Sequence, residues 1–483
     1  MRSEWRRALY GCTIFTSALL LFLVQPMMAR AILPWYGGSA GVWTTSMLFF
    51  QALLLVGYWY AHRAASGLQA RPQAGLHAAL LTGSLFLLPV IPSVPWKPGG
   101  DPVPGILILL AVTVGLPYFL LSTTTPLVQS WYAREGGPSP YRLFAVSNLA
   151  SLAALLAYPV AIEPLLPLRT QLLAWSAGYA VFAVLCGASA VASMGRKAVV
   201  APKAHSVPWG DRLIWTALAA CPSALWLATA NQVSQSIAPI PFLWVLPLSV
   251  YLLSLILCFD RAGWYSPRVF RILLPVSLLA CSVGLGQQWT APLPRTLALL
   301  MVGLFACCMF CHGELAARKP GPEQLTSYYL MMAIGGAAGG AFVAVGAPRL
   351  LNGYYEFQIS LIACLLLGFT LLYGQARPIL MLRLALVALV GVGIGLYLRG
   401  PAADRIFSAR NFYGVLEIAD GRGPEALRTL YHGPIIHGSQ YLDPARSRTA
   451  ASYYGKSSGV ELALRGGAAE GRRVGLRSEE RRV

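Results

Sequence analysis

The sequence predicts an all-α polytopic membrane protein of about 12–13 transmembrane helices in two six-helix, major-facilitator-like halves, followed by a small β-containing segment. Of the 483 residues, 56% are hydrophobic and only 11% are charged, against about 25% charged in ordinary globular domains. Apolar runs of about 20 residues, the length that spans a bilayer as a helix, recur up to residue 398. So few charges exclude a soluble protein of this size and a disordered chain.

Thirteen apolar runs are candidate spans. They lie near residues 8–29, 41–62, 74–92, 104–130, 143–162, 170–192, 212–229, 241–259, 269–286, 294–317, 326–347, 357–374 and 378–398. The first run follows a basic start, but it lacks a convincing small-residue cleavage site. We therefore expect a retained helix and not a cleaved signal peptide. The bundle is predicted over 1–398.

The formal net charge of +19 is explained by the loops between these spans. If the N-terminus is cytoplasmic, 18 of the basic residues before position 398 lie on the cytoplasmic side and five lie outside. This bias follows the positive-inside rule and predicts a cytoplasmic N-terminus. It also accounts for the charge without a nucleic-acid partner. The side of the tail stays open, because it depends on whether 378–398 crosses the membrane.

A faint internal repeat supports two halves. The tripeptide Ser-Ala-Leu, which begins at Ser17 in the first span, recurs at Ser223 in the seventh. A tyrosine opens the fifth span at Tyr141 and the eleventh at Tyr328. Repeated helical halves are typical of secondary transporters, although apolar helices also resemble one another by chance.

Polar and titratable side chains in or beside the spans are candidates for a substrate or proton path, because such groups are costly in hydrocarbon. They are Gln25, Arg30, Thr124, Asn148, Ser151, Gln232, His312 and Glu314. Asn148 and Ser151 are three residues apart and share one helix face. His312 and Glu314 are the titratable members. Hydrogen bonding between packed helices and interfacial charges at helix ends are the alternatives.

Two other motifs are interpreted structurally. Residues 335–340 read Gly-Gly-Ala-Ala-Gly-Gly and contain overlapping G-x-x-x-G pairs, which favour close helix packing. Cys308, Cys311 and His312 fit the C-x-x-C-H haem pattern, but they end an apolar helix, and haem attachment needs an exposed site. Adjacent Cys307 and Cys308 point to different helix faces, which opposes a metal site. We therefore expect no metal, and no catalytic residue.

Short ordered motifs extend from about residue 10 to 476. They include Val24-Gln25-Pro26-Met27, Leu33-Pro34-Trp35-Tyr36-Gly37-Gly38, Ser147-Asn148-Leu149-Ala150-Ser151, Trp244-Val245-Leu246-Pro247-Leu248 and Cys311-His312-Gly313-Glu314-Leu315-Ala316. In this order they resemble motifs of the bacterial fused major facilitator/spermidine synthase-like membrane proteins. The resemblance implies a location in the bacterial inner membrane.

The polar tail, residues 399–483, continues the resemblance. Strand-like residues 413–419 and turn signals at Asp420-Gly421 and His432-Gly433-Pro434 predict β structure, and the last residues read as disordered. The segment resembles the start of a spermidine synthase-like domain. By that resemblance, Gln440 would help bind decarboxylated S-adenosylmethionine and Tyr453 would line the amine pocket. Tyr454 and Gly455 depart from the family pattern.

The family's glycine-rich loop and catalytic aspartates do not follow before Val483. We therefore expect a C-terminally truncated chain, inactive alone as an enzyme and without a cofactor. Three functions stay open. The first is a transporter of a small metabolite, which includes cationic metabolites such as polyamines. The others are a membrane-anchored aminopropyltransferase whose catalytic domain is truncated here, and a membrane scaffold. The expected partners are the lipid bilayer and a small-molecule substrate. The sequence does not give the oligomeric state.

Overall fold

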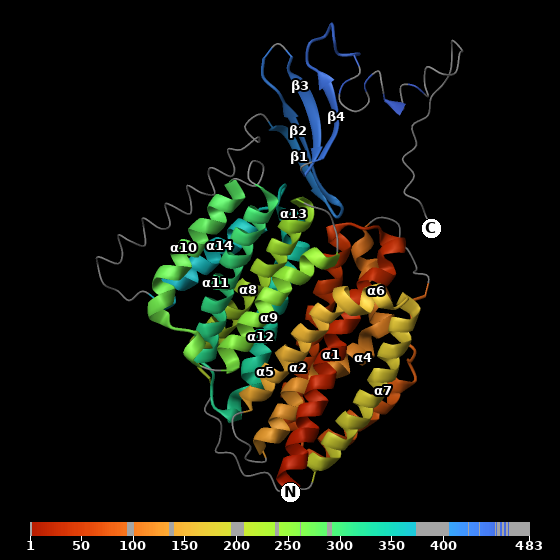
Figure 1. Ribbon diagram of the computed structural model, residues 1–483. Coiled ribbons are helices and arrows are strands. Elements are labelled where there is room, and N and C mark those ends of the chain that lie inside the picture. Colours follow the sequence, from red (N-terminus) through yellow and green to blue (C-terminus); the bar gives the residue numbers. More distant parts are fainter. Residues whose placement is uncertain are drawn as a thin grey trace.

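The computed structural model describes most of the chain as a helical bundle with a small sheet at one end (Figure 1). The described residues are 2–93, 101–134, 140–194, 207–236, 241–260, 262–286, 292–372, 405–423, 425–433, 435–449, 451, 455, 458, 459 and 462. The predicted span 378–398 and the expected disordered end lie outside them.

The described residues of the first half form seven α-helices and one π-helical stretch. They are α1 (Arg2–Tyr36), α2 (Ala40–Gly67), α3 (Ala70–Leu85), α4 (Pro102–Arg134), α5 (Tyr141–Ala157), η1 (Tyr158–Ile162), α6 (Glu163–Leu165) and α7 (Leu168–Ser193). The six predicted spans of this half coincide with helices. The third helix ends earlier than predicted because Pro89 cannot donate a backbone hydrogen bond to Leu85.

The second half repeats this order. Its elements are α8 (Trp209–Ser236), α9 (Pro241–Asp260), η2 (Ala262–Trp264), α10 (Pro267–Gly286), α11 (Leu293–Ala317), η3 (Pro322–Gln324), α12 (Leu325–Ala341), η4 (Phe342–Gly346), α13 (Ala347–Leu350) and α14 (Glu356–Leu372). Within the described ranges, eight helices are long and apolar enough to cross a membrane by length and composition. The prediction of a polytopic helical membrane protein is confirmed.

The helix contacts establish two six-helix halves. In the first half α1 packs on α4, α5 and α7, and in the second α8 packs on α11, α12 and α14. The pairs α2–α4 and α3–α7 correspond to α9–α11 and α10–α14. The halves meet through α5–α9 and α2–α12. In each pair, the second long helix of one half packs on the fifth long helix of the other half. The predicted repeat is therefore present as a pseudo-twofold arrangement.

Each half interrupts its fifth long helix in the same way. A π-helical stretch follows α5 as η1 and α12 as η4, and a short α-helix then ends the segment. Pro164 and Pro348 lie just after these stretches. Because proline has no N–H, the carbonyl four residues earlier loses its α-helical partner, and the helix widens there.

The glycines of α12 pack closely on α8, as predicted. A Cβ on Gly335 would lie 2.3 Å from the carbonyl oxygen of Thr216, and one on Gly339 would lie 2.5 Å from that of Ala220. Only glycine lets the two backbones approach so closely.

The outer surface of the bundle is apolar along its length. Val112 is 76% exposed, Val184 71% and Ile272 72%, and each lies within a long helix. In water such side chains would form large exposed patches, whereas in a bilayer they contact lipid tails.

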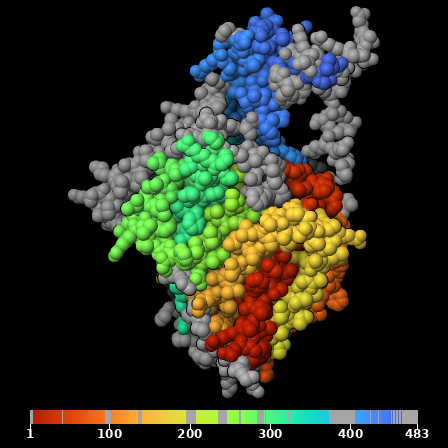
Figure 2. Space-filling view, viewed as in Figure 1, coloured from red at the N-terminus to blue at the C-terminus, as the bar shows by residue number. Residues whose placement is uncertain are grey.

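Residues 405–441 form a four-stranded antiparallel meander. Its strands are β1 (Arg405–Asn411), β2 (Gly414–Asp420), β3 (Leu427–His432) and β4 (Ile435–Tyr441), paired in that order. The predicted turns separate β2 from β3 and β3 from β4. The sheet projects from the end of the bundle opposite the N-terminus (Figures 1 and 2).

A buried ion pair attaches the sheet to the bundle. The guanidinium of Arg410 on β1 donates to both carboxylate oxygens of Glu356, the first residue of α14, at 2.9 Å each. Both side chains are less than 5% exposed. Arg410 also donates to the Gly353 carbonyl at 2.6 Å and lies over the Tyr354 ring. Desolvation by burial raises the pKa of Tyr354 above its usual value.

Candidate functional site: a polar cavity between the two halves

A cavity of about 170 Å³ lies between the two halves. Helices of both halves contribute its walls. Its polar lining residues are Ser17, Gln25, Gln51, Ser122, Thr125, Ser147, Asn148, Ser151, Ser223 and His312, and its aromatic residues are Phe22, Phe50, Tyr58, Tyr118, Phe144, Trp226 and Tyr251. Drug-sized pockets measure roughly 300–1,000 Å³, so this volume suits a small solute.

Two amides of the first half line this cavity. Gln25 donates from Nε2 to the Tyr118 hydroxyl at 3.2 Å and to the Leu21 carbonyl at 3.3 Å. Asn148 donates from Nδ2 to the carbonyl of Phe144 at 2.9 Å, one turn earlier on α5. No described residue donates to the amide oxygens of Gln25 and Asn148. Each of these oxygens therefore keeps its capacity to accept a hydrogen bond.

His312 supplies a titratable group from the second half. Its Nδ1 lies 2.8 Å from Ser254 Oγ, and the Tyr251 ring packs edge-on at 4.9 Å between ring centroids. Within the described part of the chain, Nε2 of His312 has no hydrogen-bond partner, although the side chain is buried. A buried polar atom without a partner costs free energy. A bound solute that pairs with Nε2 would recover that free energy.

Four of the eight predicted path residues line the cavity, namely Gln25, Asn148, Ser151 and His312. Thr124 does not, because its hydroxyl donates to the Leu120 carbonyl at 3.0 Å and the next residue, Thr125, faces the cavity instead. Consecutive residues of an α-helix point in directions about 100° apart, so neighbouring side chains lie on different faces.

The charged candidates lie away from the cavity. Arg30 pairs with Glu163 at 3.1 Å on partly exposed surface between α1 and α6. Glu314 pairs with Arg318 one turn along α11 and accepts a hydrogen bond from Tyr265 at 2.5 Å. Glu314 is two residues after His312, which turns it to nearly the opposite helix face.

Gln232 is buried but lies outside the cavity lining, and its neighbour Asn231 makes the contact between the halves. Thr44 on α2 donates to Oδ1 of Asn231 on α8 at 3.0 Å. Gln51 of α2 also lies 3.4 Å from Ser223 of α8. Thr44 and Asn231 form part of a second cavity, of about 370 Å³, which β1 and the β1–β2 turn border through Arg410 and Phe412. The contact between Thr44 and Asn231 therefore joins the two halves on the side of the central cavity that faces the sheet.

An aromatic layer joins the two halves on the side of the cavity toward the N-terminal end. Phe144 of α5 stacks on Tyr329 of α12 at 5.1 Å and contacts Phe259 of α9 at 4.9 Å. Tyr141 and Tyr328, the two residues that mark the repeat, meet edge-on at 6.3 Å across the halves. We call these five residues the aromatic layer.

Sequence reasoning missed the aromatic cavity residues. Tyr58, Tyr118, Trp226 and Tyr251 are common residue types for a packed or lipid-facing helix. The only available signal was a phenolic hydroxyl near the middle of a span, where it needs a polar partner.

Gln440, one of the two tail candidates, does not line this cavity. Gln440 is exposed on β4, and its Nε2 donates to the carbonyl of Ser447 at 3.2 Å. Tyr453 lies outside the described residues, so the predicted amine-pocket role stays a prediction.

The fold and this cavity define a multi-pass membrane protein with two repeated six-helix halves around a polar centre. The chain matches no known family model and no curated protein sequence. Among solved structures it is similar to the human organic anion transporter MFSD10 (TETRAN), at 13% identity over 75% of this chain and 97% of that one, with a TM-score of 0.48. It is also similar to a variant of the nucleoside transporter NupG, at 11% identity over 80% of this chain and 98% of that one, with a TM-score of 0.41. Both TM-scores lie below 0.5, and the two-half arrangement rests on the helix contacts within this chain.

Proposed function

We propose that this protein moves a small polar solute across the membrane by alternating access. One observation carries the proposal: a polar cavity lies at the interface of two repeated six-helix halves, with contacts between the halves at both ends. Transporters built from repeats place their substrate sites at such interfaces and open one end at a time by rocking the halves.

The contacts between the halves at the two ends would form and break in turn. Separation of Thr44 from Asn231 would open the cavity toward the sheet. Separation of the aromatic layer would open it toward the N-terminal end. The pairs α5–α9 and α2–α12 would act as the hinge surfaces, because they are the main contacts between the halves.

The lining favours an uncharged, hydrogen-bonding solute. The polar groups of the cavity wall are hydroxyls, amides and one imidazole, and aromatic rings cover much of the remainder. Such groups satisfy neutral donors and acceptors well. A polyamine would bring several charges into this environment at a high desolvation cost, so we rank it below a neutral solute.

We further propose the orientation given by the loop charges, with the N-terminus in the cytoplasm of a bacterial cell and the protein in its inner membrane. The sheet lies at the opposite end of the bundle and would then face outward. Labelling of a single added cysteine in β3 by an impermeant thiol reagent on intact cells tests this orientation. Labelling only after the cells are opened would contradict it.

Uptake by proteoliposomes tests the transport proposal. The panel contains neutral polar solutes, nucleosides, organic anions and polyamines. We expect Asn148→Leu to lower uptake by up to about tenfold, since it removes a hydrogen bond worth about 1.5 kcal/mol or less and places a bulkier apolar side chain in the cavity. Thr124→Val is the matched control, because Thr124 is buried on a neighbouring helix but faces away from the cavity. Equal uptake by both variants, or no uptake of any solute by the wild type, would contradict the proposal.

The membrane-anchored aminopropyltransferase and the scaffold stay predictions. Nucleoside binding to the purified chain would support the enzyme. A stable complex that is lost on deletion of 399–483, with unchanged transport, would support the scaffold.

A further inference from the structure

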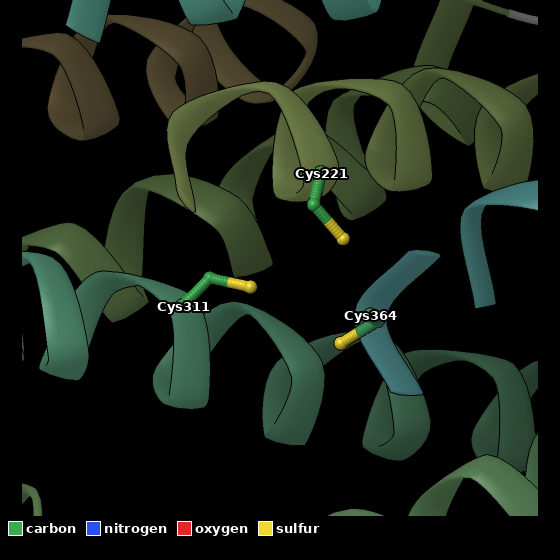
Figure 3. Close-up of side chains that lie close together, drawn as sticks. All are labelled: Cys221, Cys311 and Cys364. Atoms are coloured by element: carbon green, nitrogen blue, oxygen red, sulfur yellow. The ribbon is translucent and has the colours of Figure 1, made fainter. Parts of the chain in front are cut away.

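Three cysteine side chains from three helices meet inside the second half. Cys221 of α8, Cys311 of α11 and Cys364 of α14 place their sulfur atoms within 4.8 Å of one another. The three side chains point into one common space between the helices (Figure 3). The sequence predicts no metal site, because adjacent Cys307 and Cys308 point to different helix faces.

The cluster is separate from the central cavity. Ala219 and Ser223 of α8 line that cavity, whereas Cys221, between them, faces α14 and lies 3.7 Å from the Ser360 carbonyl. Cys311 and Cys364 are fully buried, and Cys221 is nearly so. The thiols are therefore held in packed protein and are not part of the solute path.

The donor set selects a soft metal ion. Thiolate sulfurs prefer Cu(I), zinc and iron–sulfur clusters over hard cations. With metal–sulfur bonds of about 2.3 Å, three sulfurs around one ion lie about 4 Å apart. The observed upper limit of 4.8 Å exceeds this by less than an ångström, which small side-chain rotations can close.

The number of ligands favours Cu(I) over zinc. Structural zinc sites almost always have four ligands, whereas the cluster offers three sulfurs. The sulfurs bind the ion as thiolates, so each thiol that becomes a ligand releases its proton to solvent.

We propose that Cys221, Cys311 and Cys364 form a three-sulfur site for one Cu(I) ion. The ion would join α8, α11 and α14 and so stiffen the second half as a unit. It would be a resident ion and not the transported solute, because the sulfurs do not line the cavity. The proposal does not depend on the proposed transport function.

Copper binding to the full-length chain in detergent tests the site. Cu(I) alone is supplied anaerobically from a weak chromogenic chelator, and bound copper is counted by mass spectrometry. We expect one Cu(I) per chain, three copper–sulfur distances of about 2.3 Å by X-ray absorption, and a higher Tm with copper.

Cys364→Ala and Cys221→Ala should each weaken Cu(I) binding at least about tenfold, since loss of even an outer-shell partner of a metal site typically costs that much. Cys186→Ala is the matched control, because Cys186 is an equally buried thiol in the first half. It should keep full binding and the copper-dependent rise in Tm.

Several outcomes would overturn the proposal. They are unchanged copper binding in the cluster variants, nitrogen or oxygen ligands in the absorption spectrum, tight binding of Zn²⁺ but not Cu(I), and a disulfide between two cluster cysteines in the freshly purified chain. The X-ray absorption measurement on the wild type keeps the test decisive if a variant fails to fold.

Discussion

Replacement of Glu356 by glutamine should release the sheet from the bundle. The change leaves the Arg410 guanidinium buried, less than 5% exposed, without its carboxylate partner. Removal of one member of a buried ion pair costs about 3–5 kcal/mol. The glutamine oxygen can still accept one hydrogen bond from Arg410, and the Gly353 carbonyl remains 2.6 Å from the guanidinium. We therefore expect a cost at the low end of this range, about 3 kcal/mol. That value raises the undocked fraction roughly a hundredfold.

Hydrogen–deuterium exchange on the full-length chain measures this change. Backbone amides of β1 and β2 should exchange faster in Glu356→Gln, whereas those of α8 should not change. The matched control is Asp420→Asn, which removes the partner of Arg428 on the exposed surface of the same sheet. That variant should leave docking unchanged, because exposed ion pairs contribute little.

A second variant separates charge from packing. Arg410→Met combined with Glu356→Gln removes both charges, and it should regain part of the lost protection, because no unpaired charge stays buried. Wild-type exchange rates in Glu356→Gln alone would refute the reasoning, since the ion pair would then not hold the sheet.

Two further predictions concern a helix contact and the sheet. Gly339→Ala should cost roughly 1–3 kcal/mol and lower Tm, because its Cβ would lie 2.5 Å from the Ala220 carbonyl oxygen. Gly336→Ala should not lower Tm, because the new Cβ meets open space and alanine favours a helix more than glycine does. Equal Tm values for the two variants would contradict this. Burial, with the nearby His437, lowers the pKa of His432 from its ordinary 6.5. As pH falls below 6.5, the unfolded sheet therefore takes up a proton on His432 before the folded sheet does. Protection of the β3 amides from exchange should decrease below this pH in the wild type but not in His432→Gln. A parallel decrease in the variant would show that another group is responsible.

Half of the predicted path residues line the cavity, and the reason lies in helix rotation. A polar residue within a span needs a partner, but the sequence does not say whether that partner is a cavity, its own backbone or another helix. Thr124 bonds to its own helix, and Glu314 bonds to Arg318 and Tyr265. Asn148 and Ser151 lie on the helix face that meets the other half.

The sequence by itself determined that lipid surrounds the bundle, where the helices lie and that two halves repeat. Hydrocarbon forces every backbone group in a span to bond within its own helix, so local apolar length decides where the helices lie. Only the tertiary structure decided which side chains meet. The cavity, the three-cysteine cluster and the ion pair between Arg410 and Glu356 each join residues from distant segments. Their formation depends on how each helix is rotated and what it packs against, and local sequence does not encode either.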